Sequence, residues 1–181
     1  MQIVKLSNAN INDWLEFFDA RAFKDHQEWK TCYCTYYFRP KLETYKNIHS
    51  RNRNYAIWLI QKGIMQGYLA YEDNKVIGWC NSSNKSAFTR LPTNYDVEEE
   101  SIKSIVCFIV DKEHRSKGVA TSLLQEILND AKEEGFKIVE AYPNKNAEDA
   151  FGNYHGAYGM YIKNGFIEET NANRIIVRKY L

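Results

Sequence analysis

The segment RSKGVA, residues 115–120, places a glycine and small side chains beside two cations, between an apolar run and an amphipathic one. The first turn of a helix has backbone N–H groups without partners and the positive end of the helix dipole, so it attracts anions. Gly118 has no Cβ and would let a phosphate approach the main chain, while Arg115 and Lys117 would add positive charge. If a helix begins here, these residues predict a cradle for a diphosphate.

Two other phosphate-binding patterns are missing from the chain. The sequence has no G-x-x-x-x-G-K-[ST] segment, and the glycines at 152, 156 and 159 do not have the G-x-G-x-x-G spacing. The segment 115–120 is therefore the phosphate site that the sequence favours.

The elements on either side must place this segment where a strand meets a helix. SIVCFIV, residues 104–110, is a nearly unbroken apolar run, as expected for a strand that is buried on both faces at the centre of a sheet. From Val119 to Ala131, apolar residues form one helical stripe, and Gly135 ends it. A strand at 136–142, a second helical stripe at 154–162 and two further strands follow.

The N-terminal half predicts the rest of the sheet and two helices. Residues 2–6 alternate like an edge strand, and apolar residues at helical spacing follow in 10–23 and again in 52–63. Residues 67–83 read as two strands joined by a turn at Glu72–Lys75. The polar stretch 82–101 is predicted as a long loop. The predicted order is strand, helices, three strands, helix, strand, helix, two strands.

Composition limits the class of protein. The 181 residues suit a single domain, which we place at 1–181. With 24 basic and 23 acidic side chains, the net charge of +1 argues against nucleic acid or an anionic membrane as partner. No signal peptide or membrane span is recognisable, so we expect a soluble, cytoplasmic protein. Cysteines stand at 32, 34, 80 and 107 and are expected to be reduced; the C-x-C pair is weak evidence for zinc, and we expect no metal.

Two segments resemble the signatures of the GCN5-related N-acetyltransferases. CFIVDKEHRSKGVATSLLQEILNDA is similar to the acyl-CoA signature, whose pattern [RQ]-x-x-G-x-[GA] is met by Arg115, Gly118 and Ala120. AYGMYIKNGF resembles the second signature, with matches at Ala157, Tyr161, Lys163, Gly165 and Phe166. The predicted order of elements also agrees with this family from Ile3 to the C-terminus.

The resemblance implies a fold, a donor and a reaction. The fold is α/β of the α+β type, a single domain with a central mixed, mostly antiparallel twisted sheet of about seven strands, flanked by helices and splayed between the fourth and fifth strands. The reaction is direct transfer of an acetyl group from acetyl-CoA, the co-substrate, to an amine. The implied donor-binding residues are Phe108, Ile109, Val110, Arg115, Ser116, Lys117, Gly118, Val119, Ala120 and Thr121. A main-chain N–H near Ile109 or Val110 would hold the thioester oxygen.

Acetyl transfer to an amine also needs groups that move protons. By the resemblance, Tyr161 protonates the departing sulfur, and a phenol with an ordinary pKa near 10 keeps its proton at neutral pH. The alternative is a core tyrosine with a tethered hydroxyl. The base is left open among Glu98, Glu99, Glu100, Asp111, Glu140, His155 and an ordered water. Cys107 leaves open a covalent, ping-pong route, although a cysteine in an apolar run is normally inert.

The acceptor is the least determined part of this interpretation. The aromatic segment 28–38 either walls an acceptor pocket or belongs to the core. We expect acceptor choice to depend on residues 1–62 and on the loop 82–101. A net charge near zero argues against a protein such as a histone tail as the sole substrate, so a small-molecule amine is expected, with the protein a monomer or homodimer.

Two other classes of function remain open. A non-catalytic sensor or scaffold with the same fold would bind acyl-CoA without turnover, and an unrelated α/β phosphate-ester binder would make the family resemblance accidental. The presence of both the cradle at 115–120 and Tyr161 favours an enzyme, because a sensor has no need of an acid.

Overall fold

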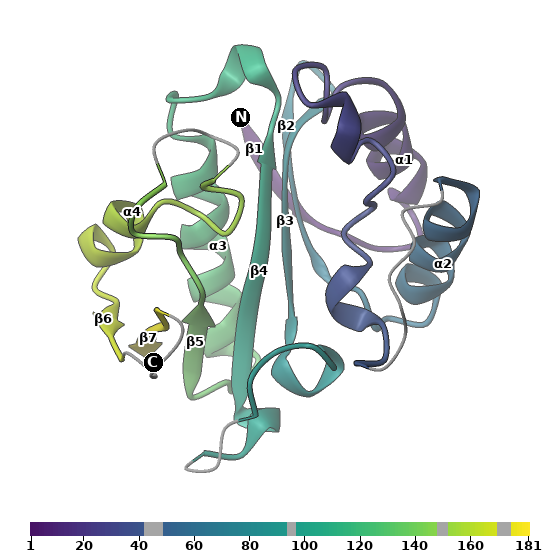
Figure 1. Cartoon of the computed structure of the whole chain (residues 1–181). Coiled ribbons are helices and arrows are strands. Elements are labelled where there is room, and N and C mark those ends of the chain that lie inside the picture. Colours follow the sequence, from purple (N-terminus) through teal and green to yellow (C-terminus); the bar gives the residue numbers. More distant parts are fainter. Residues whose placement is uncertain (42–48, 94–96, 148–151, 170–174) are drawn as a thin grey trace.

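The centre of the molecule is a mixed sheet (Figure 1). The computed structural model describes residues 1–41, 49–93, 97–147, 152–169 and 175–181. Within these ranges the sheet has seven strands, in the order β1-β2-β3-β4-β5-β7-β6. Their bounds are β1 Gln2–Lys5, β2 Gly67–Glu72, β3 Lys75–Asn84, β4 Ile102–Val110, β5 Ile138–Ala141, β6 Ile167–Glu168 and β7 Val177–Tyr180. All neighbouring pairs are antiparallel except β4 and β5, which run parallel.

Local sequence explains the hairpin and the central strand. Asp73 and Asn74 connect β2 to β3 with positive φ angles of 49° and 59°, which is the backbone that a two-residue hairpin turn needs. β4 is apolar along most of its length and is covered on both faces, as predicted for the middle of a sheet.

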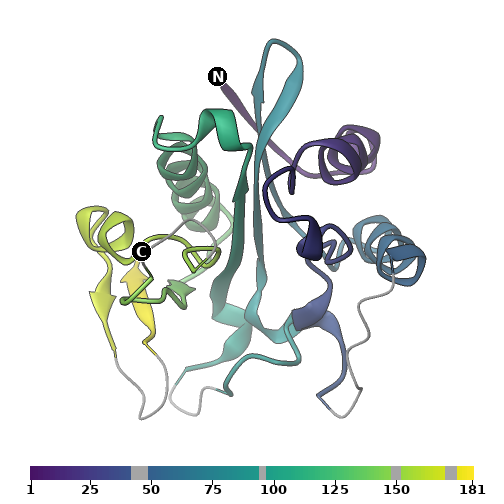
Figure 2. The ribbon, with the colours of Figure 1, turned by 45° about the horizontal axis from the view of Figure 1, so that its top comes forward.

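The sheet opens between β4 and β5. The two strands pair over Ile102–Ile105 and Ile138–Ala141, and in the described ranges the second half of β4 continues beside β3 without β5. Figures 1 and 2 show β5 next to the first half of β4. The prediction of a mixed sheet splayed between its fourth and fifth strands is therefore confirmed, and the splay leaves one edge of β4 available.

Helices cover both faces of the sheet. The helices α1 (Ile11–Ala20) and α2 (His49–Gln61) lie on one face, and α3 (Val119–Glu133) and α4 (Tyr158–Lys163) lie on the other (Figure 1). The first face packs an aromatic core that includes Trp14, Phe17, Phe18, Tyr33 and Trp79. The other face packs the predicted stripe of α3, with Val119, Leu123, Leu124, Ile127 and Ala131 buried. The predicted order of elements is confirmed.

Two local predictions were wrong. The second helical stripe was expected from residue 154, but α4 begins at Tyr158, because Gly156 takes a φ of +89° and turns the chain before the helix. His155 therefore lies in this turn and not in a helix. The loop expected from residue 82 starts later, because β3 runs on to Asn84, and its residues Phe88 and Leu91 are buried in the core.

Parts of other predictions lie outside the described residues, namely 94–96 of that loop and the turn at 171–173. In the ranges that the structure describes, no helix combines the length and the apolar character needed to cross a bilayer.

Candidate active site at the open edge of β4

A cavity of about 420 Å³ lies where β4 leads into α3; we call it the α3 cavity. Its walls are Phe108, Val110, His114, Arg115, Ser116, Gly118, Val119, Ala120, Thr121, Asn153, Gly156, Ala157 and Met160. The residues predicted to bind the donor all line it except Ile109 and Lys117. The structure thus brings the predicted cradle and the open edge of β4 to one cavity.

Gly118 is the residue before the first turn of α3 and has a left-handed backbone, with a φ of +85°. No described side chain caps the N–H groups of that turn. A Cβ at Gly118 would meet no described atom within 4 Å, so the space beside it is open. Glycine is therefore favoured here by the backbone conformation as well as by the room it leaves for an anion.

Arg115 is already engaged in an ion pair. Its guanidinium binds both carboxylate oxygens of Asp25, at 2.5 and 3.1 Å, and its Nε donates to the carbonyl of Val110 at 3.1 Å. The hydrogen bond from Arg115 lowers the pKa of Asp25. The positive charge that remains for an anion comes from the exposed Lys117 and from the start of α3.

The main-chain N–H groups of β4 alternate between β3 and the open edge. Phe108 donates to the carbonyl of Tyr154 at 2.7 Å across the splay, and Asp111 donates to the carbonyl of Ile77, near the start of β3, at 2.9 Å. Alternation then directs the N–H of Ile109 toward β3 and that of Val110 toward the open edge. Of the two expected donors to a thioester oxygen, Val110 is the one whose N–H points to the open edge of β4, where the thioester is expected.

Tyr161 is fully buried, and its hydroxyl donates to the carbonyl of His155 at 2.7 Å. Burial, and then the neighbouring thiols of Cys80 and Cys107, raise the pKa of Tyr161 above its ordinary value. The hydroxyl lies behind the wall of the α3 cavity, since a Cβ on the wall residue Gly156 would come within 2.6 Å of it. This geometry is that of a tethered core tyrosine, and the role of Tyr161 as an acid stays a prediction.

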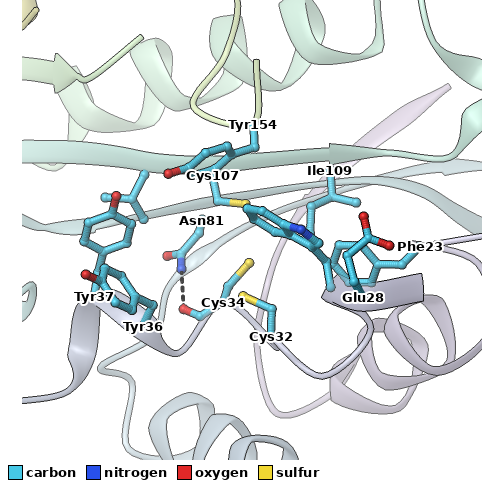
Figure 3. A pocket seen from close by; sticks show the side chains of 12 residues that line it. Phe23, Glu28, Cys32, Cys34, Tyr36, Tyr37, Asn81, Cys107, Ile109 and Tyr154 are labelled. Carbon is cyan, nitrogen blue, oxygen red and sulfur yellow. Dashed lines mark hydrogen bonds between the residues drawn. The ribbon is translucent and has the colours of Figure 1, made fainter. Parts of the chain in front are cut away.

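The opposite face of β4 carries a second cavity, of about 310 Å³, which we call the aromatic cavity. Its walls are Phe23, Glu28, Trp29, Cys32, Cys34, Tyr36, Tyr37, Asn81, Val106, Cys107, Ile109 and Tyr154 (Figure 3). The segment 28–38 was expected either to line an acceptor pocket or to belong to the core, and its residues do both. Some of its aromatic side chains line this cavity, while Tyr33 and Phe38 belong to the core. No described residue of 82–101 lines the cavity, and the dependence of acceptor choice on that loop stays a prediction.

A third cavity lies between the α3 cavity and the aromatic cavity, beside Tyr154. It has a volume of about 60 Å³ and shares Phe108, Val110 and Arg115 with the α3 cavity. It shares Phe23, Trp29, Ile109 and Tyr154 with the aromatic cavity. An extended ligand on one face of β4 can therefore present its end to a second ligand on the other face, at the open edge of the strand.

Two of the candidate bases, His155 and Asp111, lie next to cavity walls, and His155 is the one in contact with the wall of the aromatic cavity. It is buried, and its Nε2 lies 3.1 Å from the hydroxyl of Tyr37, which lines the aromatic cavity. Asp111 accepts a hydrogen bond from the N–H of Glu113 in the turn after β4. Glu98, Glu99 and Glu100 precede β4 at its other end, whereas the cavities surround its second half.

Glu140 is enclosed in a buried charge network. Its carboxylate binds Lys85 at 2.7 Å, Arg178 at 2.7 Å and the hydroxyl of Tyr142. Burial acts to raise the pKa of Glu140, but these three partners outweigh it, so the pKa lies below its ordinary value. With its oxygens held in this way, Glu140 lines neither cavity, and its role as a base stays a prediction.

The cysteines are free thiols, and three of them, Cys32, Cys34 and Cys107, line the aromatic cavity (Figure 3). Burial raises the pKa of Cys34 and of Cys80. In the described ranges no group of three or more His, Cys, Asp or Glu side chains is arranged to hold a metal ion.

Sequence reasoning missed several wall residues, above all Asn81. It lies on β3 opposite Cys107 and is fully buried. The available signal was the polar run Asn81–Ser83 at the end of an otherwise apolar strand. Asn153 and Met160 of the α3 cavity carried no comparable signal.

Comparisons with known proteins agree with this architecture. The acetyltransferase (GNAT) family matches residues 14–166, while no curated protein matches the chain. The GNAT domain of S. lividans PAT has a TM-score of 0.62 at 14% identity, covering 99% of this chain and 89% of that one. Ribosomal-protein-alanine N-acetyltransferase from Brucella melitensis has a TM-score of 0.59 at 12% identity, covering 100% of both chains. The PaiA N-acetyltransferase from Thermoplasma acidophilum, in complex with coenzyme A, has a TM-score of 0.55 at 18% identity, covering 100% of both. Because the family match extends over most of the chain, the protein belongs to the acetyltransferase (GNAT) family.

Proposed function

We propose that the protein is an N-acetyltransferase that transfers the acetyl group of acetyl-CoA directly to the amine of a small molecule. The observation that carries this proposal is the pair of cavities on opposite faces of β4, with the third cavity between them. Membership of a family of acetyl-CoA-dependent acyltransferases supports it, as does the coenzyme A bound to the similar Thermoplasma protein.

The α3 cavity is the proposed donor site. The diphosphate would lie on the N–H groups of the first turn of α3, which no described side chain caps, with Lys117 nearby. The rest of the donor would follow the open edge of β4, where Val110 offers an N–H for a carbonyl oxygen. The N–H of Phe108 on the same edge already donates to Tyr154.

The aromatic cavity is the proposed acceptor site. The amine nitrogen attacks the thioester carbon, the carbon–sulfur bond breaks, the nitrogen loses one proton and the thiolate gains one. Tyr37 and His155 are the proposed proton acceptors: the Tyr37 hydroxyl takes the proton of the amine while it passes its own to Nε2 of a neutral His155. Tyr161 is the proposed acid, which requires its hydroxyl to leave the carbonyl of His155.

An assay of turnover distinguishes this enzyme from a sensor with the same fold. The protein is mixed with acetyl-CoA and a panel of primary amines, while thiol release and the mass of each amine are followed. We expect thiol release that depends on the amine, together with an acetylated product. Tight binding of acetyl-CoA without either product would favour the sensor or scaffold. A cytoplasmic location and a monomeric or homodimeric state stay predictions of the sequence.

A further inference from the structure

Asn81 is a buried polar residue in the wall of the aromatic cavity with half of its amide unused. Its side chain is fully buried, and its Nδ2 donates to the carbonyl of Cys34 at 3.3 Å (Figure 3). Its Oδ1 is buried and accepts no hydrogen bond from any described residue. The amide cannot be turned around, because Oδ1 would then face the carbonyl of Cys34, which has no hydrogen to donate.

Another buried asparagine in this protein has both ends of its side-chain amide paired. Asn52 is equally buried, and its Oδ1 accepts from Arg39 at 2.9 Å while its Nδ2 donates to Thr31 at 2.8 Å. Ser82 Oγ also lacks a partner among the described residues, but Ser82 does not line the aromatic cavity. Of the described side chains with such an atom, Asn81 alone lines that cavity. Because an unpaired buried acceptor is costly, its position in the wall indicates a ligand that donates to it.

The rest of the aromatic cavity fits an apolar ring. Phe23, Trp29, Tyr36, Tyr37 and Tyr154 surround a volume of about 310 Å³, which is enough for a ring with a short chain. The carboxylate of Glu28 lies 3.3 Å from Nδ1 of His26 but is exposed, with 62% of its side chain accessible, and would attract a cationic amine.

Asn81 is displaced from the place where an amine would react. It lies on β3, whereas the thioester would lie at the far edge of β4, and neighbouring strands are about 4.8 Å apart. The group that donates to Asn81 is therefore a second polar group on the acceptor and not the reacting amine.

We propose that the acceptor is a small primary arylalkylamine whose ring carries a hydrogen-bond donor, a hydroxyl or an amino group, that binds Oδ1 of Asn81. The inference rests on the proposed function, since it treats the aromatic cavity as the acceptor site. A buried acceptor should discriminate strongly between amines with and without a donor group on the ring, because an amine without this group leaves Oδ1 unpaired in the complex.

The test compares 2-phenylethylamine with its 3-hydroxy and 4-hydroxy derivatives, which differ by a single hydroxyl group. With the wild-type protein and acetyl-CoA, we expect kcat/KM to be at least about tenfold higher for one of the hydroxylated amines. In Asn81→Leu, which keeps the size of the side chain, the ratio should fall towards one. The matched control Asn52→Leu alters a buried asparagine outside the cavity and should keep the wild-type ratio.

The outcomes separate this inference from the proposed function. Equal kcat/KM values for the three amines with the wild type would overturn the role of Asn81 while leaving the acetyltransferase intact, and so would a ratio unchanged in Asn81→Leu. If no amine is acetylated, calorimetric titration of the wild type with the same amines decides: tighter binding of a hydroxylated amine supports the inference, and equal or absent binding overturns it. The wild-type comparison holds even if Asn81→Leu does not fold.

Discussion

Two tyrosine hydroxyls on opposite faces of β4 are assigned the proton transfers of the reaction. The hydroxyl of Tyr37 lies 3.1 Å from Nε2 of His155, and that of Tyr161 donates to the carbonyl of the same residue. His155 thus connects the wall of the aromatic cavity with the buried tyrosine of α4. The two roles can be separated, because each hydroxyl can be removed without its ring.

For Tyr37→Phe we expect kcat to fall by about 10²–10⁴-fold with an unchanged KM for acetyl-CoA, because the ring stays in the wall while the proton acceptor is lost. Tyr36→Phe is the control, since this neighbouring tyrosine lines the same cavity. Steady-state kinetics on both variants measures the effect. Equal losses in the two variants would remove Tyr37 and His155 from the mechanism.

Tyr161→Phe tests the acid. Removing the hydroxyl leaves the carbonyl of His155 without this donor, so we expect a loss of about 1 kcal/mol in unfolding free energy. If Tyr161 also protonates the sulfur, kcat falls by about 10²–10⁴-fold while the KM for the donor is kept. Thermal unfolding and thiol release are measured on one preparation. A wild-type kcat together with lower stability would show that Tyr161 is a structural residue.

Protonation of Glu140 should lower the stability of the folded protein at acidic pH. Its pKa in the folded protein lies below the ordinary 4.5, so the network with Lys85 and Arg178 contributes its full stability above that value. The contribution is lost as the pH falls through the lower folded pKa. Glu140→Gln leaves Lys85 buried without its counter-ion, and we expect a cost of about 3–5 kcal/mol at neutral pH.

Urea unfolding at several pH values checks this prediction. The wild type should lose stability as the pH falls below about 5, and Glu140→Gln should show a shallower slope over that range. A variant with the same slope as the wild type would mean that other carboxylates account for the acid sensitivity.

At the scale of elements, the start of α3 and the open edge of β4 line one cavity, the proposed donor site. Both ends of α3 carry a glycine with a left-handed backbone and open space beside it, Gly118 at φ +85° and Gly135 at φ +82°. Asparagine tolerates this conformation better than other residues with a side chain. The two ends therefore provide a matched pair of substitutions.

Gly118→Asn should raise the Kd for coenzyme A at least about tenfold, because the side chain would fill the space proposed for the diphosphate. Gly135→Asn should leave that Kd unchanged, and the two variants should lose similar amounts of stability. Calorimetric titration with coenzyme A supplies the measurement. A Kd for Gly118→Asn equal to that of the wild type would place the diphosphate elsewhere.

Much of this arrangement follows from local sequence signals, and the rest depends on contacts between distant residues. The apolar run of β4, the stripe of α3 and the segment 115–120 predict a central strand, the helix that follows it and the wall of the α3 cavity, since each signal is contained in one element. The splay of the sheet was implied only by the resemblance to the family. The pairing of Arg115 with Asp25 and that of Tyr37 with His155 join residues far apart in the chain. No local pattern predicts such pairs, and the polar run Asn81–Ser83 did not by itself show that Asn81 faces a cavity.

At the scale of the whole molecule, the proposed function requires the sheet to separate two ligands whose reactive ends come together at the edge of β4. The helices α1 and α2 and the segment after α1 cover the face with the proposed acceptor site, while α3 and α4 cover the face with the proposed donor site (Figures 1 and 2). Direct transfer across the edge of β4 needs both ligands at once. A covalent route through Cys107 would need only the donor for its first step.

The measurement that tests this claim most directly uses acetyl-CoA with an isotopic label in the acetyl group. The protein is incubated with the labelled donor, with and without a hydroxylated phenylethylamine. The masses of the intact protein and of the amine are then measured by mass spectrometry. We predict labelled N-acetylamine in equal amount to the free coenzyme A thiol, and no labelled protein when the amine is left out. Labelled protein in the absence of amine, or bound donor without any labelled amine, would contradict direct transfer between the two cavities.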